Sequence, residues 1–368
     1  MNARALPGSP DAAVTARVAA TIRADVRAQS AYAVAKGAGL VKLDAMENPY
    51  GLPAELRDQV GRAAAAVALN RYPDGPADGV KDALRAALRL DPRVALLLGN
   101  GSDEIIQIIT TAVAAPGAHV VAPDPTFVMY RVNARLAHAE YVAVPLAADF
   151  ALDEAAMLAA IARVRPALVW IAYPNNPTGN AFDRAAIERI IAASPGLVVV
   201  DEAYYAFADD SFLPRVLDFP NLVVVRTVSK IGMAGLRLGY AAGHPAWIAE
   251  LDKVRPPYNV GALVQAVAPV LLAAGDVLDA QAARLREERE RLVAGLARLP
   301  GARVFPTRTN FVLVRLPDAQ AAFNALREAG ILVKNLHGWH PLLDQCLRIT
   351  VGTPDENGAV LAALIPPP

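Results

Sequence analysis

Short apolar segments recur through the middle of the chain, and each one ends abruptly in polar residues. They are rich in valine, isoleucine and leucine, and they span residues 94–98, 119–122, 168–172, 197–200 and 222–225. Continuous apolar runs of this kind are typical of strands that are buried on both faces. Helix-prone stretches lie between them. The alternation predicts an α/β fold, in which a mostly parallel sheet lies between helices.

The pattern changes after residue 240, where a smaller unit is expected. The charged segment 276–299 predicts a long helix with a solvated face. Strand-like segments follow at 304–305, 311–316, 331–333 and 347–351, with helices over 318–330 and after Pro354. A chain of 368 residues exceeds one average domain. We therefore expect a large domain over 46–265 and a small α+β domain over 266–368, with 1–45 forming an N-terminal arm and part of the small domain.

Composition excludes several classes of protein. Lys+Arg and Asp+Glu are balanced at 36 each, so no net charge favours nucleic acid or an anionic membrane. The single cysteine, Cys346, leaves no internal disulfide and no cysteine-cluster metal site, which fits a reducing cytoplasm. No apolar run reaches the ~18 residues that a membrane span needs. His337 and His340 lack a supporting carboxylate pattern, so no metal site is expected.

The first 30 residues carry several arginines among alanines, which faintly resembles an organelle transit peptide. Asp11 and Asp25 interrupt that pattern, and no apolar signal core is present. We interpret this segment as a mobile arm or a docking helix.

A lysine follows directly after the apolar segment 222–225. Ser229 and Lys230 lie just past its carboxyl end, and Arg237 follows in a glycine-bearing stretch. Ligands of open parallel sheets bind at the carboxyl ends of the strands. A lysine there can form a Schiff base with a carbonyl cofactor while a hydroxyl and an arginine hold a phosphate. An ordinary surface lysine in a strand-to-helix loop would fit the Ser-Lys pair equally well.

A glycine turn at 99–104 is a second candidate site. It joins the strand 94–98 to a helix whose buried side is Ile105, Ile106, Ile108 and Ile109. The start of a helix presents unpaired backbone N–H groups that can bind an anion. Glu104 replaces the last glycine of a dinucleotide fingerprint, so a phosphate monoester fits better than a pyrophosphate. Helix capping without any ligand is the alternative.

Other strand ends also carry polar or aromatic side chains. Asp201 follows a buried strand, where a carboxylate needs a cationic partner unless it caps the next helix. The turn 174–179 aims an asparagine amide at the strand end, and Phe127 could lie flat on a ring or belong to the core. Arg348 stands inside an apolar strand, which favours an anionic partner. Tyr72 lies in a polar turn, where a half-buried loop aromatic is the alternative.

Taken together, the segments resemble the fold-type I pyridoxal-phosphate aminotransferases, and most closely the histidinol-phosphate aminotransferase family. The resemblance covers nearly everything after about residue 30, in the family's order. Its motifs are Asn-Arg-Tyr-Pro-Asp at 70–74, Gly-Asn-Gly-Ser-Asp-Glu at 99–104, Pro-Asn-Asn-Pro-Thr-Gly at 174–179, Asp-Glu-Ala-Tyr at 201–204, Arg-Thr-Val-Ser-Lys at 226–230, Gly-Leu-Arg-Leu-Gly-Tyr at 235–240 and Cys-Leu-Arg-Ile-Thr-Val-Gly at 346–352. It implies a large domain with a mostly parallel seven-stranded sheet and a smaller α+β domain.

The resemblance also implies roles for the residues that contact the cofactor, pyridoxal 5'-phosphate. Lys230 would hold it covalently, and Asp201 would pair with its ring nitrogen. Asn176 and Tyr204 would donate hydrogen bonds to its phenolic oxygen, and Phe127 would stack on its ring. The residues expected around its phosphate are Ser102, Asp103, Ser229, Arg237 and, from a neighbouring subunit, Tyr72. A homodimer with shared active sites follows from that last expectation.

The implied reaction transfers the amino group of L-histidinol phosphate to 2-oxoglutarate, in L-histidine biosynthesis. The products would be imidazole-acetol phosphate and L-glutamate. Arg348 is the expected anion clamp, Asn176 also faces the substrate, and Tyr32 is a candidate lid. Many relatives carry another arginine after 331–333, where this chain has Lys334. Lysine cannot grip an anion bidentately. Aromatic or other amino acids therefore remain alternative donors, as does decarboxylation of a phosphorylated amino acid.

Two other classes of protein are weighed against this one. A cofactor-binding sensor without turnover would be expected to carry a DNA-binding module or a basic stretch, and the sequence has neither. A nicotinamide dehydrogenase would need the glycine fingerprint that Glu104 interrupts.

Overall fold

The computed structural model describes residues 10–31, 35 and 37–364. They divide into two compact units, Met1–Ala38 and Gly39–Pro368. The first unit contains helices α1 (Pro10–Thr21) and α2 (Ala24–Arg27). Arg27 Nη1 donates to the Ala19 carbonyl at 2.5 Å, and Arg23 pairs with Asp25 at 2.7 Å. The segment is helical over these two ranges, and its role as a mobile arm or a docking helix stays a prediction. The expected lid residue, Tyr32, lies outside the described residues.

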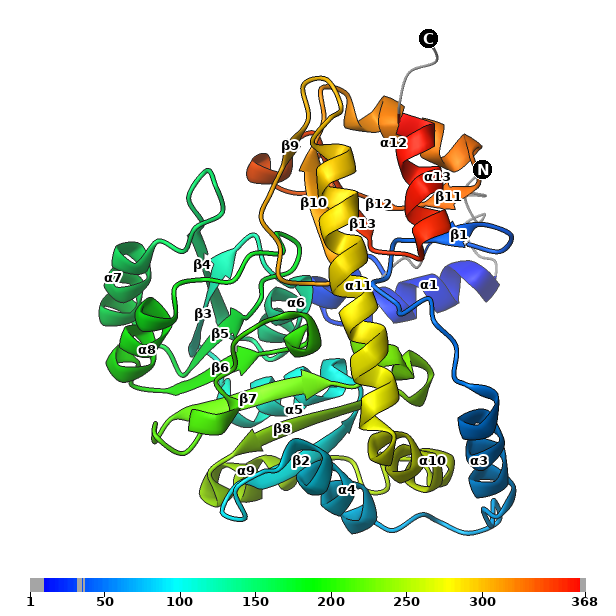
Figure 1. Ribbon diagram of the computed structural model, residues 1–368. Helices are drawn as coiled ribbons and strands as arrows, with labels where there is room; N and C mark the ends of the chain where they lie inside the picture. The colour runs from blue at the N-terminus through cyan, green and yellow to red at the C-terminus, as the bar shows by residue number, and fades with distance from the viewer. Residues whose placement is uncertain (1–9, 32–34, 36, 365–368) are drawn as a thin grey trace. The chain divides into compact units, whose positions relative to one another are not determined.

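The second unit is built around a seven-stranded sheet in the order β2-β8-β7-β6-β5-β3-β4. The strands are β2 (Ala95–Asn100), β3 (His119–Asp124), β4 (Glu140–Pro145), β5 (Leu168–Ala172), β6 (Leu197–Asp201), β7 (Leu222–Thr227) and β8 (Leu238–Gly243). Strand β8 alone runs opposite to the other six, since it pairs antiparallel with both β2 and β7. The predicted mostly parallel sheet is therefore confirmed, and β6 is its central strand (Figure 1).

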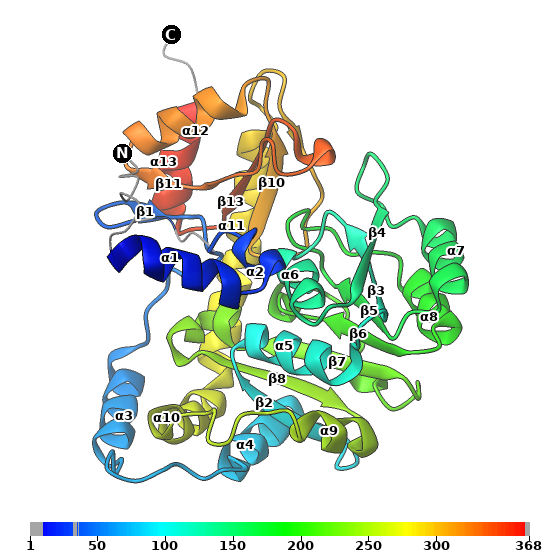
Figure 2. The same ribbon diagram turned by 180° about the vertical axis from the view of Figure 1, so that it is seen from behind.

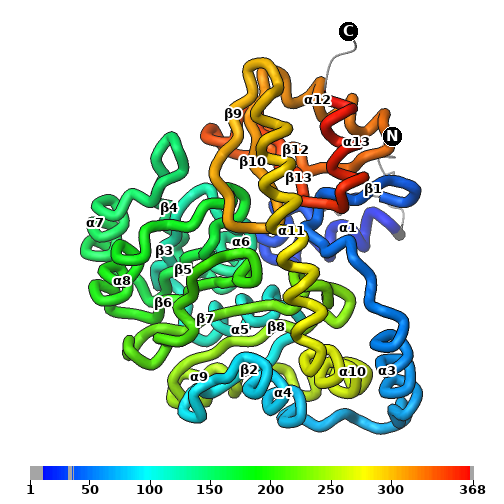
Figure 3. Tube along the Cα trace, in the orientation of Figure 1, coloured from blue at the N-terminus to red at the C-terminus, as the bar shows by residue number. Residues whose placement is uncertain are grey.

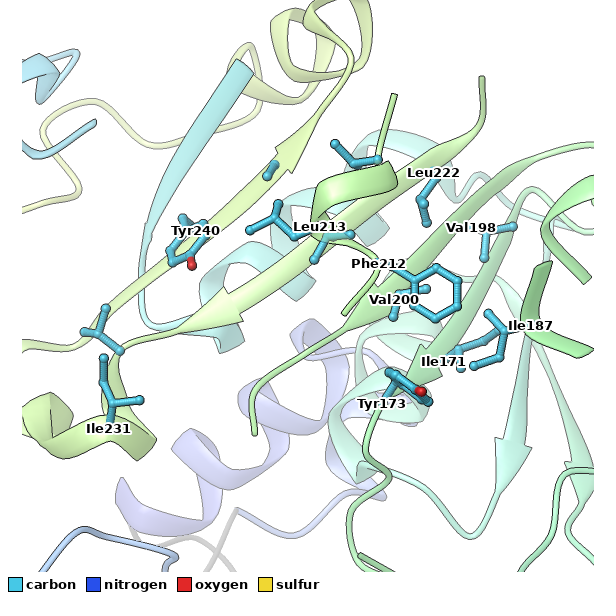
Figure 4. Close-up of a cluster of buried hydrophobic side chains, with 14 of the residues drawn as sticks. Ile171, Tyr173, Ile187, Val198, Val200, Phe212, Leu213, Leu222, Ile231 and Tyr240 are labelled. Atoms are coloured by element: carbon cyan, nitrogen blue, oxygen red, sulfur yellow. The ribbon is translucent and has the colours of Figure 1, made fainter. Parts of the chain in front are cut away.

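Each face of this sheet packs against its own set of helices. Helices α5 (Ser102–Val113), α6 (Val128–Leu136) and α9 (Pro245–Asp252) cover one face, where Trp170 and the four predicted isoleucines of α5 are buried. Figure 2 shows this side. Helices α4 (Asp78–Leu88), α7 (Glu154–Val164), α8 (Arg184–Ala193) and α10 (Ala262–Ala273) contribute to the opposite core. There Ile171, Val198 and Val200 lie beside Ile187 and Phe212 (Figure 4). Successive strand residues thus point to opposite faces.

A smaller antiparallel sheet, in the order β12-β13-β10-β9, forms the second layer of this unit. Its strands are β9 (Arg303–Val304), β10 (Phe311–Arg315), β12 (Lys334–Asn335) and β13 (Cys346–Thr350). Helices α11 (Gly275–Leu296), α12 (Ala319–Glu328) and α13 (Pro354–Leu364) pack with it around a separate core. The N-terminal strand β1 (Val41–Lys42) pairs in parallel with β11 (Ile331–Leu332). An early segment therefore belongs to this late part of the chain (Figure 3).

The remaining elements connect these layers. They are α3 (Ala54–Ala65), the short helices η1 (Tyr205–Phe207), η2 (Leu213–Arg215), η4 (Ala234–Leu236) and η5 (Pro341–Leu343), and the π-helical turn η3 (Ser229–Met233). The expected boundary between residues 265 and 266 falls inside α10. Because a helix is one hydrogen-bonded element, the break at Ala274 between α10 and α11 is the more natural division, and the domain limits stay a prediction.

No single helix among residues 10–31 and 37–364 is long and apolar enough to cross a membrane. Helices α10 and α11 would meet that test only as a pair bent by 73°, and only by length and composition.

A buried ion pair ties β6 to β7 beside the carboxyl end of the sheet. Arg226 Nη2 lies 2.8 Å from Glu202 Oε2, and both side chains are almost fully buried. Glu202 also accepts hydrogen bonds from the Phe212 amide and the Ser211 hydroxyl. Arg226 lies over the ring of Tyr205, 4.0 Å from its centroid. A buried charge is tolerated only with partners of this kind, and this network fixes the backbone next to Asp201.

Candidate active site

The sequence-predicted residues come from the carboxyl ends of neighbouring strands. Asp201 is the last residue of β6, Lys230 follows β7 in the turn η3, and Asn176 follows β5. Ser102 begins α5 directly after β2. Because β5, β6 and β7 are parallel neighbours, their ends lie along one edge of the sheet.

Asp201 is a carboxylate held by neutral donors. Its Oδ2 accepts a hydrogen bond from the Tyr130 hydroxyl at 2.7 Å, and its Oδ1 accepts one from the Ala203 amide at 3.1 Å. The side chain is buried, and this burial raises the pKa of Asp201 to about 6. Its environment therefore suits a cationic partner, which would stabilise the ionised form.

Lys230 presents an amine whose charge is poorly stabilised. Its Nζ donates to the Ala45 carbonyl at 3.0 Å. Burial, and next the positive charge of Arg348, lower the pKa of Lys230 to about 8. An amine with such a pKa is partly neutral near physiological pH, as a nucleophile or a general base must be. Arg348 lies nearby, since its Nη2 donates to the carbonyl of Asp44, the residue next to Ala45.

The start of α5 forms a cradle with Arg237. Gly101 has a φ of +80°, and a Cβ there would lie 2.6 Å from Arg237 Nη2. A Cβ on Gly239 would lie 2.5 Å from the backbone nitrogen of Ser102. The positive φ at Gly101 and the backbone contact at Gly239 both favour glycine.

Two further side chains complete this cradle. Arg237 Nη1 lies 3.5 Å from Ser229 Oγ, and its Nη2 lies 3.4 Å from Asp103 Oδ2. Helix α5 has no side-chain cap on its first N–H groups. A guanidinium, a hydroxyl and a helix N-terminus together suit a phosphate group, as the sequence predicted for Ser102, Asp103, Ser229 and Arg237.

Arg348 links the small sheet to the large one. Its Nη1 donates to Asn176 Oδ1 at 2.6 Å, and its Nη2 donates to the Asp44 carbonyl at 2.9 Å. The guanidinium carbon also lies 5.4 Å from the ring centroid of Phe311. These contacts orient the guanidinium group, which was predicted to bind an anion.

Lys334 is the cross-strand neighbour of Arg348, since the two residues are paired in the β12–β13 register. Its ammonium lies 4.4 Å from the ring centroid of Trp339. Burial, and next the charge of Arg348, lower the pKa of Lys334. Two cations are thus held close together, an arrangement that an anion would stabilise.

The predicted aromatic residues differ in their surroundings. Phe127 packs edge-on against Tyr130, with centroids 5.7 Å apart, and Tyr204 packs edge-on against Phe311 at 5.2 Å. Tyr72, in contrast, is 82% exposed and stacks on Tyr258 with centroids 4.8 Å apart. The contacts described for Tyr72 do not join it to the cluster around Lys230.

Three contributors were missed by the sequence reasoning. Tyr130, the Ala45 carbonyl and the ring of Phe311 each contact a predicted site residue. Tyr130 carries a weak local signal, because it lies three residues after Phe127. The other two come from segments distant in sequence, and nothing in their local pattern indicates the contact.

The sequence profile of the aminotransferase class I and II family matches residues 38–364. The chain therefore belongs to this family. It is 57% identical over 344 residues to histidinol-phosphate aminotransferase 1 of Burkholderia lata, covering 93% of this chain and 96% of that protein. The histidinol-phosphate aminotransferase of Chromobacterium violaceum is 54% identical, with coverage of 93% and 96%. Within the family, the chain thus belongs with the histidinol-phosphate aminotransferases.

A solved structure agrees with this grouping. The histidinol-phosphate aminotransferase from Sinorhizobium meliloti, in complex with pyridoxal-5'-phosphate, is 27% identical and superimposes with a TM-score of 0.83. The match covers 94% of this chain and 96% of that one. The fold class predicted from sequence is therefore confirmed.

We predict that Lys230→Met stabilises the cofactor-free protein at neutral pH. The lysine pKa is about 8 when folded, below its ordinary value of 10.5, so the folded state binds fewer protons than the unfolded state between these values. Wild-type stability should then rise with pH across that window. The methionine variant should gain on the order of 2–3 kcal/mol at pH 7, and this gain should shrink as the pH rises from about 8 to 10.5.

The measurement is urea unfolding of both proteins at a series of pH values. Lys253→Met, which removes an exposed lysine, is the control for the loss of one positive charge. A gain for Lys230→Met that is absent, or that does not change with pH, would contradict the assigned environment of the amine.

Proposed function

We propose that the protein catalyses the reversible transfer of the amino group of L-histidinol phosphate to 2-oxoglutarate. The products are imidazole-acetol phosphate and L-glutamate, and the reaction belongs to L-histidine biosynthesis in the cytoplasm. The observation that carries the proposal is that Lys230 and Arg348 donate to adjacent backbone carbonyls, Nζ to Ala45 at 3.0 Å and Nη2 to Asp44 at 2.9 Å. These contacts join a weakly basic amine and an anion clamp in one site, as this substrate, an amine that carries a phosphate, requires.

The residues present fit pyridoxal phosphate as the cofactor. The cradle at Gly101, Ser102, Ser229 and Arg237 suits its phosphate, since a Cβ at Gly101 would fill the space beside the arginine. Asp201 suits its ring nitrogen, because this buried carboxylate receives only neutral donors in the hydrogen bonds described above. When bound, the cofactor supplies an aldehyde that reacts with amines and a cationic ring that accepts the electrons released at the substrate α-carbon.

The roles of the chain's own residues follow from their surroundings. Lys230 would hold the cofactor and, once displaced by the substrate amine, take the proton from the substrate α-carbon, since its pKa of about 8 leaves a neutral fraction at physiological pH. Asp201 would keep the ring nitrogen protonated. Phe127 would lie against the ring, and Asn176 and Tyr204 would bind its phenolic oxygen. The roles given to Asp201, Phe127, Asn176 and Tyr204 rest on their positions after the strand ends and on the family resemblance.

The substrate phosphate is proposed to bind between Arg348 and Lys334. Arg348 is already oriented by Asn176 and the Asp44 carbonyl, so little side-chain entropy is lost when it binds an anion. Lys334 adds a second charge beside it. A phosphate dianion offers more charge to this pair than the carboxylate of an aromatic amino acid does, which favours the phosphorylated donor.

We further propose a homodimer in which Tyr72 reaches the phosphate cradle of the partner subunit. Tyr72 and its stacking partner Tyr258 are exposed, and Leu69 and Leu263 are exposed nearby in sequence. The Gln265 amide donates to the Asp74 carbonyl, which ties these two segments together. Exposed apolar side chains on one tied surface are typical of a protein interface.

A comparison of amino donors tests the proposed substrate. We expect kcat/KM for L-histidinol phosphate to exceed that for L-phenylalanine roughly ten- to hundredfold, as one or two charge-assisted hydrogen bonds would give. Lys334→Met should reduce the value for histidinol phosphate more than the value for phenylalanine.

Steady-state kinetics with 2-oxoglutarate as the acceptor provides both values, and Lys253→Met is the matched control for removing a lysine charge. A higher efficiency with phenylalanine would favour the alternative, an aminotransferase for aromatic amino acids.

A subunit-mixing experiment tests the shared site. Lys230→Ala and Tyr72→Ala dimers should each have greatly reduced activity. A mixed dimer would carry one site with both wild-type residues, so mixing should restore roughly a quarter of wild-type activity if the subunits exchange statistically. Activity that stays at the level of the two separate variants after verified exchange would show that Tyr72 does not act across subunits.

A further inference from the structure

Tyr130 contacts two of the residues assigned to the cofactor. It lies in α6, is fully buried, and donates its hydroxyl hydrogen to Asp201 Oδ2 at 2.7 Å. Its ring meets the edge of Phe127 with centroids 5.7 Å apart and planes at 84°. One side chain therefore contacts both the carboxylate expected at the ring nitrogen and the aromatic ring expected to stack on the cofactor.

A third residue, Trp170, also contacts Tyr130 and helps to fix its ring. The tyrosine ring stacks on Trp170 of β5, with centroids 4.7 Å apart and planes at 5°. Trp170 is itself fully buried in the face of the sheet. A ring held between an indole face and a phenyl edge has little freedom to rotate. Its hydroxyl is therefore aimed at one oxygen of Asp201, while the Ala203 amide holds the other oxygen.

The pKa values of Asp201 and Tyr130 determine what this hydrogen bond does. Burial raises the pKa of Asp201, the charges of Asp103 and Glu202 raise it further, and the hydrogen bond from Tyr130 lowers it. Burial also raises the pKa of Tyr130 well above its ordinary value, with contributions from Asp201, Tyr141 and Tyr204. The phenol therefore stays protonated and remains a donor at physiological pH. A hydrogen bond to an ionised acceptor stabilises the ionised form.

We propose that Tyr130 is a positioning residue for this aminotransferase: its hydroxyl holds Asp201 ionised and oriented toward the cofactor ring nitrogen, and its ring holds Phe127 in place. The proposal rests on the cofactor assignment of the proposed function but not on the identity of the amino donor. Tyr130 itself takes no part in the chemistry. It acts through Asp201, so its removal changes the strength and the pH dependence of cofactor binding as well as the rate.

The test is the affinity of Tyr130→Phe for pyridoxal phosphate between about pH 5 and 8. Without the hydroxyl, Asp201 should ionise at higher pH, so the acidic fall in affinity should shift upward by about one pH unit. Binding is followed by absorbance without any donor substrate. In the transamination assay, kcat should fall about tenfold or more while KM for the donor changes little.

The matched control is Tyr173→Phe. Tyr173 is also buried and also donates to an aspartate, Asp210, at 3.0 Å. It should leave the pH dependence of cofactor affinity unchanged, although it removes the same kind of hydrogen bond. A loss of stability alone would therefore not imitate the expected shift.

A second substitution keeps the packing intact. Replacing Tyr130 with 3,5-difluorotyrosine retains the ring and makes the hydroxyl a stronger donor, so the acidic fall in affinity should move to lower pH. If neither replacement moves this pH dependence, the proposal is overturned. Because no donor is present, this result is independent of the preference between histidinol phosphate and phenylalanine.

Discussion

The buried carboxylate of Asp201 is the constraint on which the rest of the site depends. It ends the central strand of the large sheet, where both faces are covered by helices. An ionised group in such a place is unfavourable without partners. The structure supplies a phenol and a backbone amide, and the neighbouring Glu202 carboxylate is neutralised separately by Arg226. A nearby cation would further stabilise the ionised form of Asp201, and a protonated pyridine nitrogen is such a cation.

The opposite imbalance occurs at Lys230. Its side chain is partly buried, and burial together with the charge of Arg348 disfavours its positive charge, so its pKa falls to about 8. Arg348 comes from the small sheet, yet it donates to Asn176 at the edge of the large sheet. This contact between the small sheet and the turn after β5 orients the guanidinium, whose charge also contributes, after burial, to the lowered pKa of the lysine.

Much of this arrangement could be predicted from sequence, for physical reasons that differ between elements. Strands β5, β6 and β7 are buried on both faces, so continuous valine and isoleucine runs reveal them and also locate Asp201 and Lys230 at their ends. Strand β8 was not predicted, because Leu-Gly-Tyr-Ala-Ala-Gly has low strand propensity and becomes a strand only through burial between β2 and β7. Edge strand β4 is only partly buried and was also not predicted, although it contains the apolar run Tyr-Val-Ala-Val at 141–144.

Contacts between distant segments set the limit of prediction at the site. The bond from Tyr130 to Asp201 joins residues 71 positions apart, and the bond from Arg348 to Asn176 joins residues 172 apart. The sequence predicts whether each of these residues stands at a strand end, inside a strand or on a helix, but only the packed fold sets which pairs meet. Tyr72 illustrates the converse case, since it is exposed and the ring contact described for it is with Tyr258, which is not a predicted site residue.

The most direct measurement is borohydride reduction of the cofactor-loaded protein, followed by peptide mapping with mass spectrometry. The chain has only six lysines, Lys36, Lys42, Lys81, Lys230, Lys253 and Lys334, so the site of attachment can be assigned without ambiguity. The cofactor should be fixed to Lys230, and Lys230→Ala should leave no reduced adduct. Attachment at Lys334 or any other lysine, or full activity in Lys230→Ala, would contradict the account.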